Sequence, residues 1–233
     1  MEISVPAPGG PIDGYLAEPK GDGPHPAVVI IHDVTGLSQD ARNITDRFAA
    51  EGYLALSPNM YSRGGLVRCV KGVFQNLFAQ QGRAFDDIEA SRQLLAARED
   101  CTGKVGVVGF CMGGGFALIA ATREFDASAP YYGMLPKDLS VLDGACPVVA
   151  SFGKKDVSLR GAAAKLEVKL AEAGIPHDVK EYPEAGHSFA NQFRLGPLNA
   201  LIKVAGFGYH EASSEDAWRR VTAFFDEHLV RTE

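Results

Sequence analysis

Apolar positions along the chain follow two spacings, one typical of buried strands and one typical of helices. Ala27–His32 is a continuous apolar and β-branched run, as expected of a strand covered by helices on both faces. Ser38–Glu51 instead places Ile44 and Phe48 at helical spacing, and Gly52 follows it as a natural helix stop. The two patterns predict a strand followed by a helix.

The same alternation continues along the rest of the chain. Strands are predicted at Glu2–Val5, Pro11–Glu18, Ala27–His32, Tyr53–Ser57, Lys104–Phe110, Ala129–Gly133, Pro147–Phe152 and Asp178–Pro183, and helices at Ser38–Glu51, Ala84–Arg98, Met112–Arg123, Leu159–Ala173 and Glu215–Val230. A Pro-Gly-Gly turn joins the first two strands, which indicates a strand pair at a sheet edge. Strands separated by helices predict an α/β fold with a mostly parallel sheet wrapped on both faces.

Two stretches do not fit this alternation. Asn59–Gly82 and Asn191–Ser213 are expected to be long connections, which in compact domains are often functional loops or partial caps. Because no internal repeat or low-complexity linker is present, we expect residues 1–233 to form one domain.

Composition narrows the classes of function. The net charge of −6 argues against a nucleic-acid or anionic-membrane partner, and no apolar run approaches the roughly 20 residues of a membrane span. The N-terminus lacks the pattern of a signal peptide. The scattered cysteines (Cys69, Cys101, Cys111, Cys146) match no zinc pattern and favour reduced thiols in a cytoplasm. We therefore expect a cytoplasmic protein without metal or cofactor, and either a monomer or a homodimer.

The segment Gly109-Phe110-Cys111-Met112-Gly113 lies between a predicted strand and a predicted helix, where a nucleophile elbow is found. The sharp turn requires small residues on either side of Cys111, and free N–H groups at the helix start favour a thiolate and a developing oxyanion. A buried structural cysteine or a nucleotide-binding turn are the alternatives. The second is disfavoured because the spacing G-x-G-x-x-G is absent.

Two later residues complete a nucleophile–acid–histidine order. Asp156 follows the predicted strand Pro147–Phe152, and His187 follows Asp178–Pro183, so both lie where catalytic groups of open α/β sheets gather. Each has a simpler interpretation, because Asp156 could cap the next helix and His187 could be a surface histidine. Two other histidines have structural interpretations: His32 would pack and hydrogen-bond beneath the site, and His210 would lie in the C-terminal connection.

The chain resembles the dienelactone hydrolase family of α/β-hydrolases over nearly its whole length. The most specific matches are Gly109–Gly114, Tyr131-Tyr132-Gly133, Gly153–Asp156 and Ala185-Gly186-His187-Ser188-Phe189. The resemblance implies a Cys111–Asp156–His187 triad. It also implies a carboxylate that holds the cysteine quiescent, and Asp33 stands at that place, one methylene shorter than the family's usual glutamate.

A second departure concerns the substrate. The resemblance implies an arginine shortly after His-Ser-Phe that grips a substrate carboxylate, but this chain has Asn191 there. Arg63, Arg68 or Arg194 could supply positive charge, or each could be a solvated surface residue.

The expected reaction is hydrolysis of an ester or lactone, without dependence on nucleic acid or membrane. Cys111 would form a thioester acyl-enzyme, with the oxyanion bound by the backbone N–H groups of Met112 and Val34. Two alternatives stay open. One is a broad carboxylesterase or thioesterase without dienelactone activity, and the other is a non-catalytic ligand-binding α/β-hydrolase domain.

Overall fold

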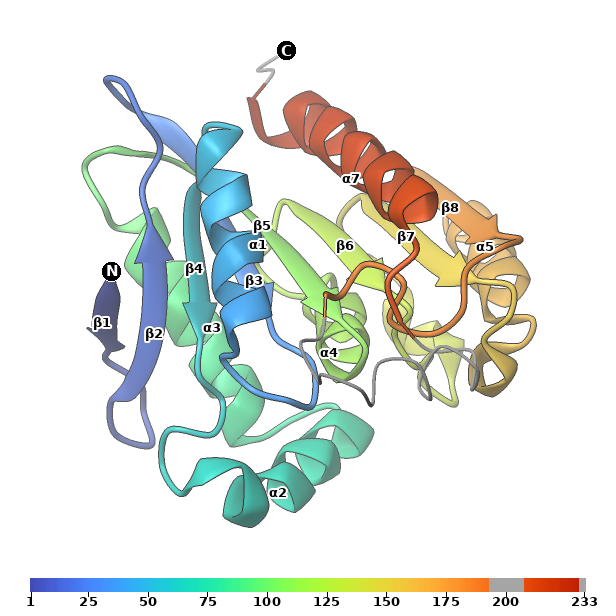
Figure 1. Cartoon of the computed structure of the whole chain (residues 1–233), viewed down its shortest axis with the longest axis horizontal. Helices are drawn as coiled ribbons and strands as arrows, with labels where there is room; N and C mark the ends of the chain where they lie inside the picture. The colour runs from blue at the N-terminus through green and yellow to red at the C-terminus, as the bar shows by residue number, and fades with distance from the viewer. Residues whose placement is uncertain (193–207, 231–233) are drawn as a thin grey trace.

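The computed structural model describes residues 1–192 and 208–230, and one sheet extends through this part of the chain (Figure 1). Its strands are β1 (Glu2–Val5), β2 (Ile12–Ala17), β3 (His25–Ile31), β4 (Leu54–Pro58), β5 (Cys101–Phe110), β6 (Ala127–Tyr131), β7 (Val148–Gly153) and β8 (His177–Tyr182). The order across the sheet is β1-β2-β4-β3-β5-β6-β7-β8. The pairs β1–β2 and β2–β4 are antiparallel and the other pairs are parallel.

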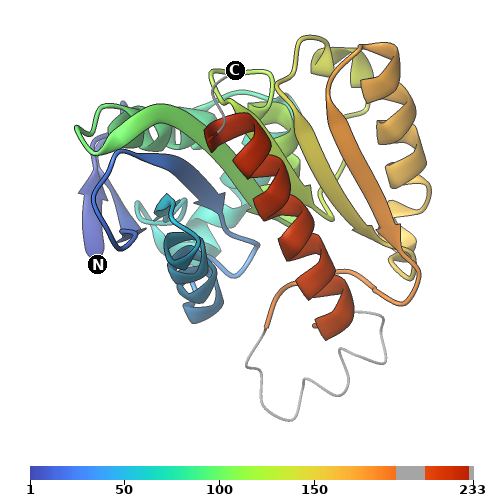
Figure 2. The same cartoon turned by 90° about the horizontal axis from the view of Figure 1, so that it is seen from above.

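Helices cover both faces of this sheet. They are α1 (Gln39–Ala50), α2 (Gly65–Ala79), α3 (Arg83–Ala96), α4 (Met112–Ala120), α5 (Ala162–Glu172) and α7 (Glu211–Phe225), with shorter helical turns at η1 (Leu139–Leu142), η2 (Val157–Leu159) and η3 (Asp226–Val230). Helices α1 and α7 lie on one face, and α3, α4 and α5 on the other (Figure 2). The predicted α/β-hydrolase architecture, with an edge strand pair and a mostly parallel sheet, is confirmed.

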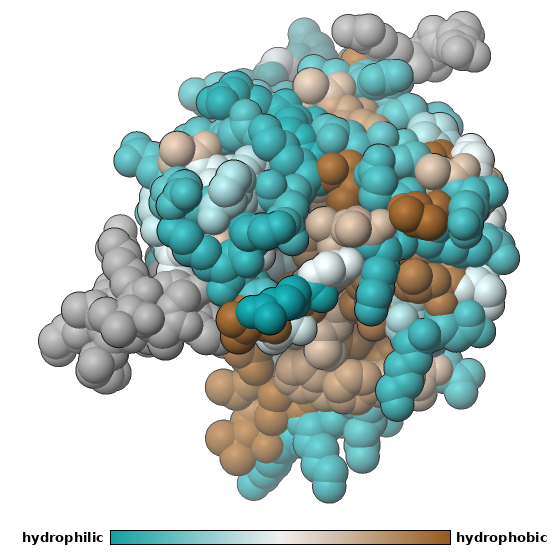
Figure 3. Space-filling model, turned by 90° about the vertical axis from the view of Figure 1, so that its right-hand side faces the viewer, coloured by the Kyte–Doolittle hydropathy of each residue, from teal (hydrophilic) through white to brown (hydrophobic). Residues whose placement is uncertain are grey.

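The core lies between these layers. Strand β3 shows why, since Ala27–Ile31 is fully buried and packs against the helices of both faces. The surface on the β8 side is mostly hydrophilic, with apolar side chains gathered toward its lower edge (Figure 3).

Three expectations about elements were wrong. The segment Asn59–Gly82 is not a structureless connection, because it contains α2, which lies beyond the carboxyl ends of the parallel strands (Figure 1). Strands β3 and β8 begin earlier than the predicted starts at Ala27 and Asp178, with His25 and His177 as their first residues. Of the second expected connection, Asn191–Ser213, residues 193–207 lie outside the described residues, and α7 already begins at Glu211.

The parallel strands bring their carboxyl ends to one edge of the sheet. The connections that leave β3, β5, β7 and β8 carry Asp33, Cys111, Asp156 and His187 in turn. The topology therefore places these four residues on the same side of the molecule.

Candidate active site

Cys111 sits at a sharp turn between β5 and α4. Its φ of 55° and ψ of −113° lie in a strained region for a residue with a side chain, which projects the thiol away from the strand. A Cβ at Gly109 would lie 1.9 Å from the carbonyl oxygen of Gly113, and a Cβ at Gly113 would lie 2.2 Å from that of Ile31. Both neighbours of the elbow must therefore be glycine, as the sequence pattern indicates.

The fold brings Cys111, His187 and Asp156 into one hydrogen-bonded line. His187 Nε2 lies 3.1 Å from Cys111 Sγ, and His187 Nδ1 lies 2.5 Å from Asp156 Oδ2. Because a carboxylate can only accept, Nδ1 carries the proton and Nε2 faces the sulfur. The side chains of His187 and Asp156 are both largely withdrawn from solvent.

The hydrogen bonds of this line stabilise the charged forms of His187 and Asp156. Burial by itself disfavours the imidazolium, but the hydrogen bonds of His187 with Asp156 and Cys111 outweigh it and raise the His187 pKa to about 9. Burial also opposes the charge of Asp156, yet the bonds from His187 and Ser158 keep its pKa below the ordinary value. The arrangement favours a charged His187 beside an ionised Asp156.

Asp156 also has the simpler role that its sequence position allows. Its Oδ1 accepts from the backbone N–H and the hydroxyl of Ser158, at 2.9 and 2.5 Å, and so caps η2. The capping role and the contact with His187 use different oxygens. The cap therefore orients the carboxylate toward the histidine instead of competing with it.

Val34 and Met112, the expected oxyanion donors, are connected by Tyr61. The Tyr61 hydroxyl donates to the Val34 carbonyl at 3.3 Å and lies 3.6 Å from Met112 Sδ. Its ring is buried, whereas Val34 is 40% exposed. Tyr61 thus links the loop after β3 to the first residue of α4.

His32 is a buried brace beneath this loop. Its Nε2 accepts from the backbone N–H of Met60 at 3.2 Å, so Nδ1 carries the proton and donates to the Asp33 carbonyl at 2.7 Å. Burial lowers the His32 pKa to about 4. His32 accordingly packs and hydrogen-bonds beneath the site, as the sequence interpretation has it, and His210 caps α7 through Ser213.

Asp33 does not hydrogen-bond to Cys111 in this structure. Its Oδ1 accepts from the backbone N–H and hydroxyl of Thr35, at 2.7 and 2.6 Å, so it closes a local turn. Burial raises the pKa of Asp33 in spite of these bonds. A gating role for this residue stays a prediction.

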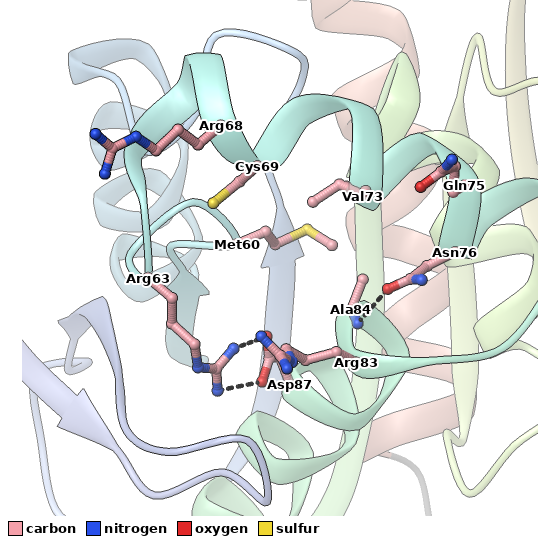
Figure 4. A pocket seen from close by; sticks show the side chains of 11 residues that line it. Met60, Arg63, Arg68, Cys69, Val73, Gln75, Asn76, Arg83, Ala84 and Asp87 are labelled. Atoms are coloured by element: carbon pink, nitrogen blue, oxygen red, sulfur yellow. Dashed lines mark hydrogen bonds and ion pairs between the residues drawn. The ribbon is translucent and has the colours of Figure 1, made fainter.

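Of the arginines considered as substrate ligands, Arg63 is engaged in another part of the molecule. Arg63 forms a two-pronged ion pair with Asp87 of α3, at 2.7 and 2.8 Å, in a pocket of about 380 Å³ that also holds Cys69 (Figure 4). Asp87 is only 2% exposed, so Arg63 is committed to a structural pair. In the same view the Arg68 guanidinium points away from the pocket, and Arg194 lies outside the described residues.

Asn191 joins the histidine-bearing loop to α1 and β6. It accepts from the Tyr132 hydroxyl at 2.6 Å and donates to Asp40 Oδ2 at 2.8 Å. The Tyr132 ring lies 5.2 Å from the His187 ring, centroid to centroid. Asn191 therefore reaches the triad through Tyr132, with both ends of its amide engaged, and a role in substrate binding stays a prediction.

Three residues of this site were not singled out from the sequence: Tyr61, Tyr132 and Asp40. Tyr132 had a signal, since it lies in the Tyr131-Tyr132-Gly133 match and takes a left-handed φ of 38°. Asp40 had none beyond its place in a first helical turn, which is an ordinary position for an acidic residue.

Among residues 1–192 and 208–230, no group of His, Cys, Asp and Glu side chains is arranged to hold a metal ion. Within the same described ranges, no helix has the length and apolar character that crossing a membrane requires.

The sequence and the fold are similar to those of known proteins. The model of the dienelactone hydrolase family matches residues 12–229. The chain is 26% identical to a Yersinia pestis protein named "Putative carboxymethylenebutenolidase", over 98% of this chain and 88% of that protein. A crystal structure titled "Putative Dienelactone Hydrolase", from Klebsiella pneumoniae, superposes with a TM-score of 0.79 at 26% identity, covering 97% and 98% of the two chains. A dienelactone hydrolase-like promiscuous phosphotriesterase from metagenomic libraries shares the fold, with a TM-score of 0.82 at 21% identity and 98% coverage of each chain.

Proposed function

Because the chain belongs to the dienelactone hydrolase family, we propose that it hydrolyses carboxylic esters or lactones with Cys111 as nucleophile. The observation that carries the proposal is the line Cys111–His187–Asp156, with its contacts of 3.1 and 2.5 Å. A thiol, a histidine aimed at it and a carboxylate that orients the histidine are the parts that nucleophilic acyl transfer needs.

In the first half of the reaction, Cys111 is the attacking group. His187 takes the thiol proton, and the sulfur attacks the substrate carbonyl to form a tetrahedral intermediate. The protonated His187 then gives its proton to the leaving alcohol, and a thioester acyl-enzyme forms. Asp156 stabilises the imidazolium and holds it in the orientation that both proton transfers need.

The negative charge of the intermediate needs donors on the other side of the carbonyl. We assign this role to the backbone N–H groups of Met112, the first residue of α4, and of Val34. Tyr61 supports the assignment because it ties the loop of Val34 to Met112. In the second half of the reaction, His187 takes a proton from water, which attacks the thioester and releases the acid.

The thiol restricts the class of substrate. A thiolate leaves a tetrahedral intermediate more readily than an unactivated amine, so amides tend to revert to substrate. Esters and enol lactones have better leaving groups, which favours them over peptides. This makes an ester or lactone hydrolase the preferred proposal.

The test is steady-state hydrolysis of a dienelactone and of 4-nitrophenyl butyrate by the wild-type protein and by Cys111→Ala. We expect the variant to lose at least about a thousandfold in kcat/KM, as other enzymes do without their nucleophile. Cys146→Ala is the matched control, since burial raises the pKa of that thiol to about 12 and makes it a poor nucleophile.

Each outcome has a distinct meaning. Turnover of the simple ester without the lactone would favour a broad carboxylesterase or thioesterase. Full activity of Cys111→Ala would refute the mechanism. Absence of both activities in the wild type would favour a ligand-binding domain.

A further inference from the structure

Two carboxyl groups outside the triad, those of Asp33 and Asp40, act on Tyr132, whose ring lies beside the His187 ring. Asp33 lies in the loop after β3, where hydrogen bonds from Thr35 stabilise its ionised form. Asp40 lies in the first turn of α1. Burial raises the pKa of Tyr132 and both charges raise it further, and Asp33 also interacts electrostatically with His187 itself. Within residues 1–192 and 208–230 neither carboxylate forms an ion pair with a lysine or an arginine.

Asp40 is held toward the site by the segment that follows His187. It accepts from the side chain of Asn191 at 2.8 Å and from the backbone N–H of Gln192 at 3.1 Å. These two donors favour the ionised carboxylate, which burial alone would disfavour. Burial outweighs them and raises the pKa of Asp40. The two hydrogen bonds nevertheless fix the position of the carboxylate.

The same contacts fix the orientation of Asn191. Its Nδ2 faces the Asp40 carboxylate and its Oδ1 accepts from Tyr132, which leaves neither end of the amide for a substrate anion. A flipped amide would set an oxygen against a carboxylate and is disfavoured. Because Asp40 holds Asn191 in this orientation, the position beside His187 favours a neutral substrate group over an anionic one.

The start of α1 is blocked as an anion site for the same reason. A helix N-terminus attracts anions through its free N–H groups and its dipole. Here the Ser38 hydroxyl already accepts from Ala41 at 3.3 Å, and Asp40 supplies the negative charge that the dipole favours. This helix start therefore does not favour the binding of a substrate carboxylate.

We propose that Asp40, acting with Asn191, selects against esters whose acyl chain carries a carboxylate and thereby directs the site to neutral esters. The inference rests on the ester hydrolysis proposed above and adds its substrate class. Two like charges that approach one another near a protein surface repel strongly enough to change a rate constant by roughly tenfold.

The first test compares two esters that differ only in this charge, 4-nitrophenyl pentanoate and mono-4-nitrophenyl glutarate, with uncatalysed hydrolysis subtracted. We expect the wild type to prefer the pentanoate by roughly tenfold in kcat/KM, and Asp40→Asn to narrow this ratio several-fold. Sodium chloride should narrow the wild-type ratio, because salt screens partly exposed charges. Asp46→Asn, the same change elsewhere on α1, where Asp46 faces Tyr15, should leave the ratio as it is.

The second test uses Cys111 without turnover. Peptide mass spectrometry measures the rates at which Cys111 is alkylated by iodoacetamide, which is neutral, and by iodoacetate, which is anionic. We expect Asp40→Asn to raise the iodoacetate rate relative to the iodoacetamide rate, and Asp46→Asn to change it less.

The outcomes separate the two proposals. No Cys111-dependent turnover of either ester would refute the proposed function. Turnover of both esters at equal rates, or an equal effect of Asp40→Asn and Asp46→Asn in both tests, would refute the charge selection alone.

Discussion

At the scale of single residues, substitution can separate two roles of Asp156, capping a helical turn and orienting His187. It caps η2 through Ser158, and it also contacts His187. Asp138 makes the first kind of contact without the second, because it caps η1 by accepting from Ser140 N–H at 2.9 Å. The chain therefore contains its own control for the capping role.

We predict that Asp156→Asn lowers kcat on 4-nitrophenyl butyrate by at least roughly a hundredfold, since an amide cannot hold the imidazole tautomer or stabilise its cation as a carboxylate does. Asp138→Asn removes only an exposed cap, so it should leave kcat unaltered and change the urea midpoint little. Both variants are compared with wild type by steady-state kinetics and urea unfolding. If the two lost activity equally little, Asp156 would be a cap and nothing more.

Chain order and loop position predicted three residues that the fold brings together, but not their surroundings. Cys111, Asp156 and His187 lie in contact, and their catalytic roles stay a prediction. Asp40 and Asn191 are separated by 151 positions, and their hydrogen bond depends on how α1 and the loop after β8 meet in space. No local pattern carries that information, and the same holds for Tyr61 beneath the loop of Val34.

At the scale of elements, most strands and helices were predicted because their apolar spacing is regular, and α2 was missed for a physical reason. It begins at a double glycine, has no side-chain N-cap and contains Gly72 in its interior. Its apolar residues do recur at helical spacing, but Val67 and Phe78 are 89% and 66% exposed. A helix that lies on the edge of the fold has a weak signal in both capping and burial.

Substitutions of Gly113 in α4 and Gly72 in α2 test whether each helix has room for a side chain at that position. We predict that Gly113→Ala lowers the free energy of unfolding by roughly 3 kcal/mol or more, or prevents folding, because its Cβ would meet the Ile31 carbonyl of β3 and force α4 away. Gly72→Ala has open space around its Cβ in the interior of α2 and should stabilise by about 0.5–1 kcal/mol. Urea midpoints report both changes. An unchanged midpoint for Gly113→Ala would mean that α4 can move away from β3 without lowering the free energy of unfolding.

At the scale of the whole molecule, stability in acid is coupled to His32. This histidine joins the loop after β3 to the backbone of Met60, and burial holds its folded-state pKa near 4, below the ordinary value of 6.5. Above pH 6.5 the ring is neutral in both states. As the pH falls from 6.5 toward 4, the unfolded chain binds a proton that the native state does not, so the native state loses stability. The full difference is roughly 3 kcal/mol.

We therefore predict that the free energy of unfolding of the wild type falls between pH 6.5 and 4 more steeply than that of His32→Gln, with the two curves parallel above pH 7. Asp33 and Asp40 act in the opposite direction, because their raised pKa values relieve a charge penalty as the pH falls, but they are present in both proteins and cancel in the difference. His25→Gln, at the other end of β3, controls for the loss of a histidine. Urea unfolding at several pH values gives the slopes, and NMR titration of the wild-type rings gives the His32 pKa directly. Parallel slopes throughout, or a His32 ring that titrates near 6.5, would show that the native state takes up this proton at no cost.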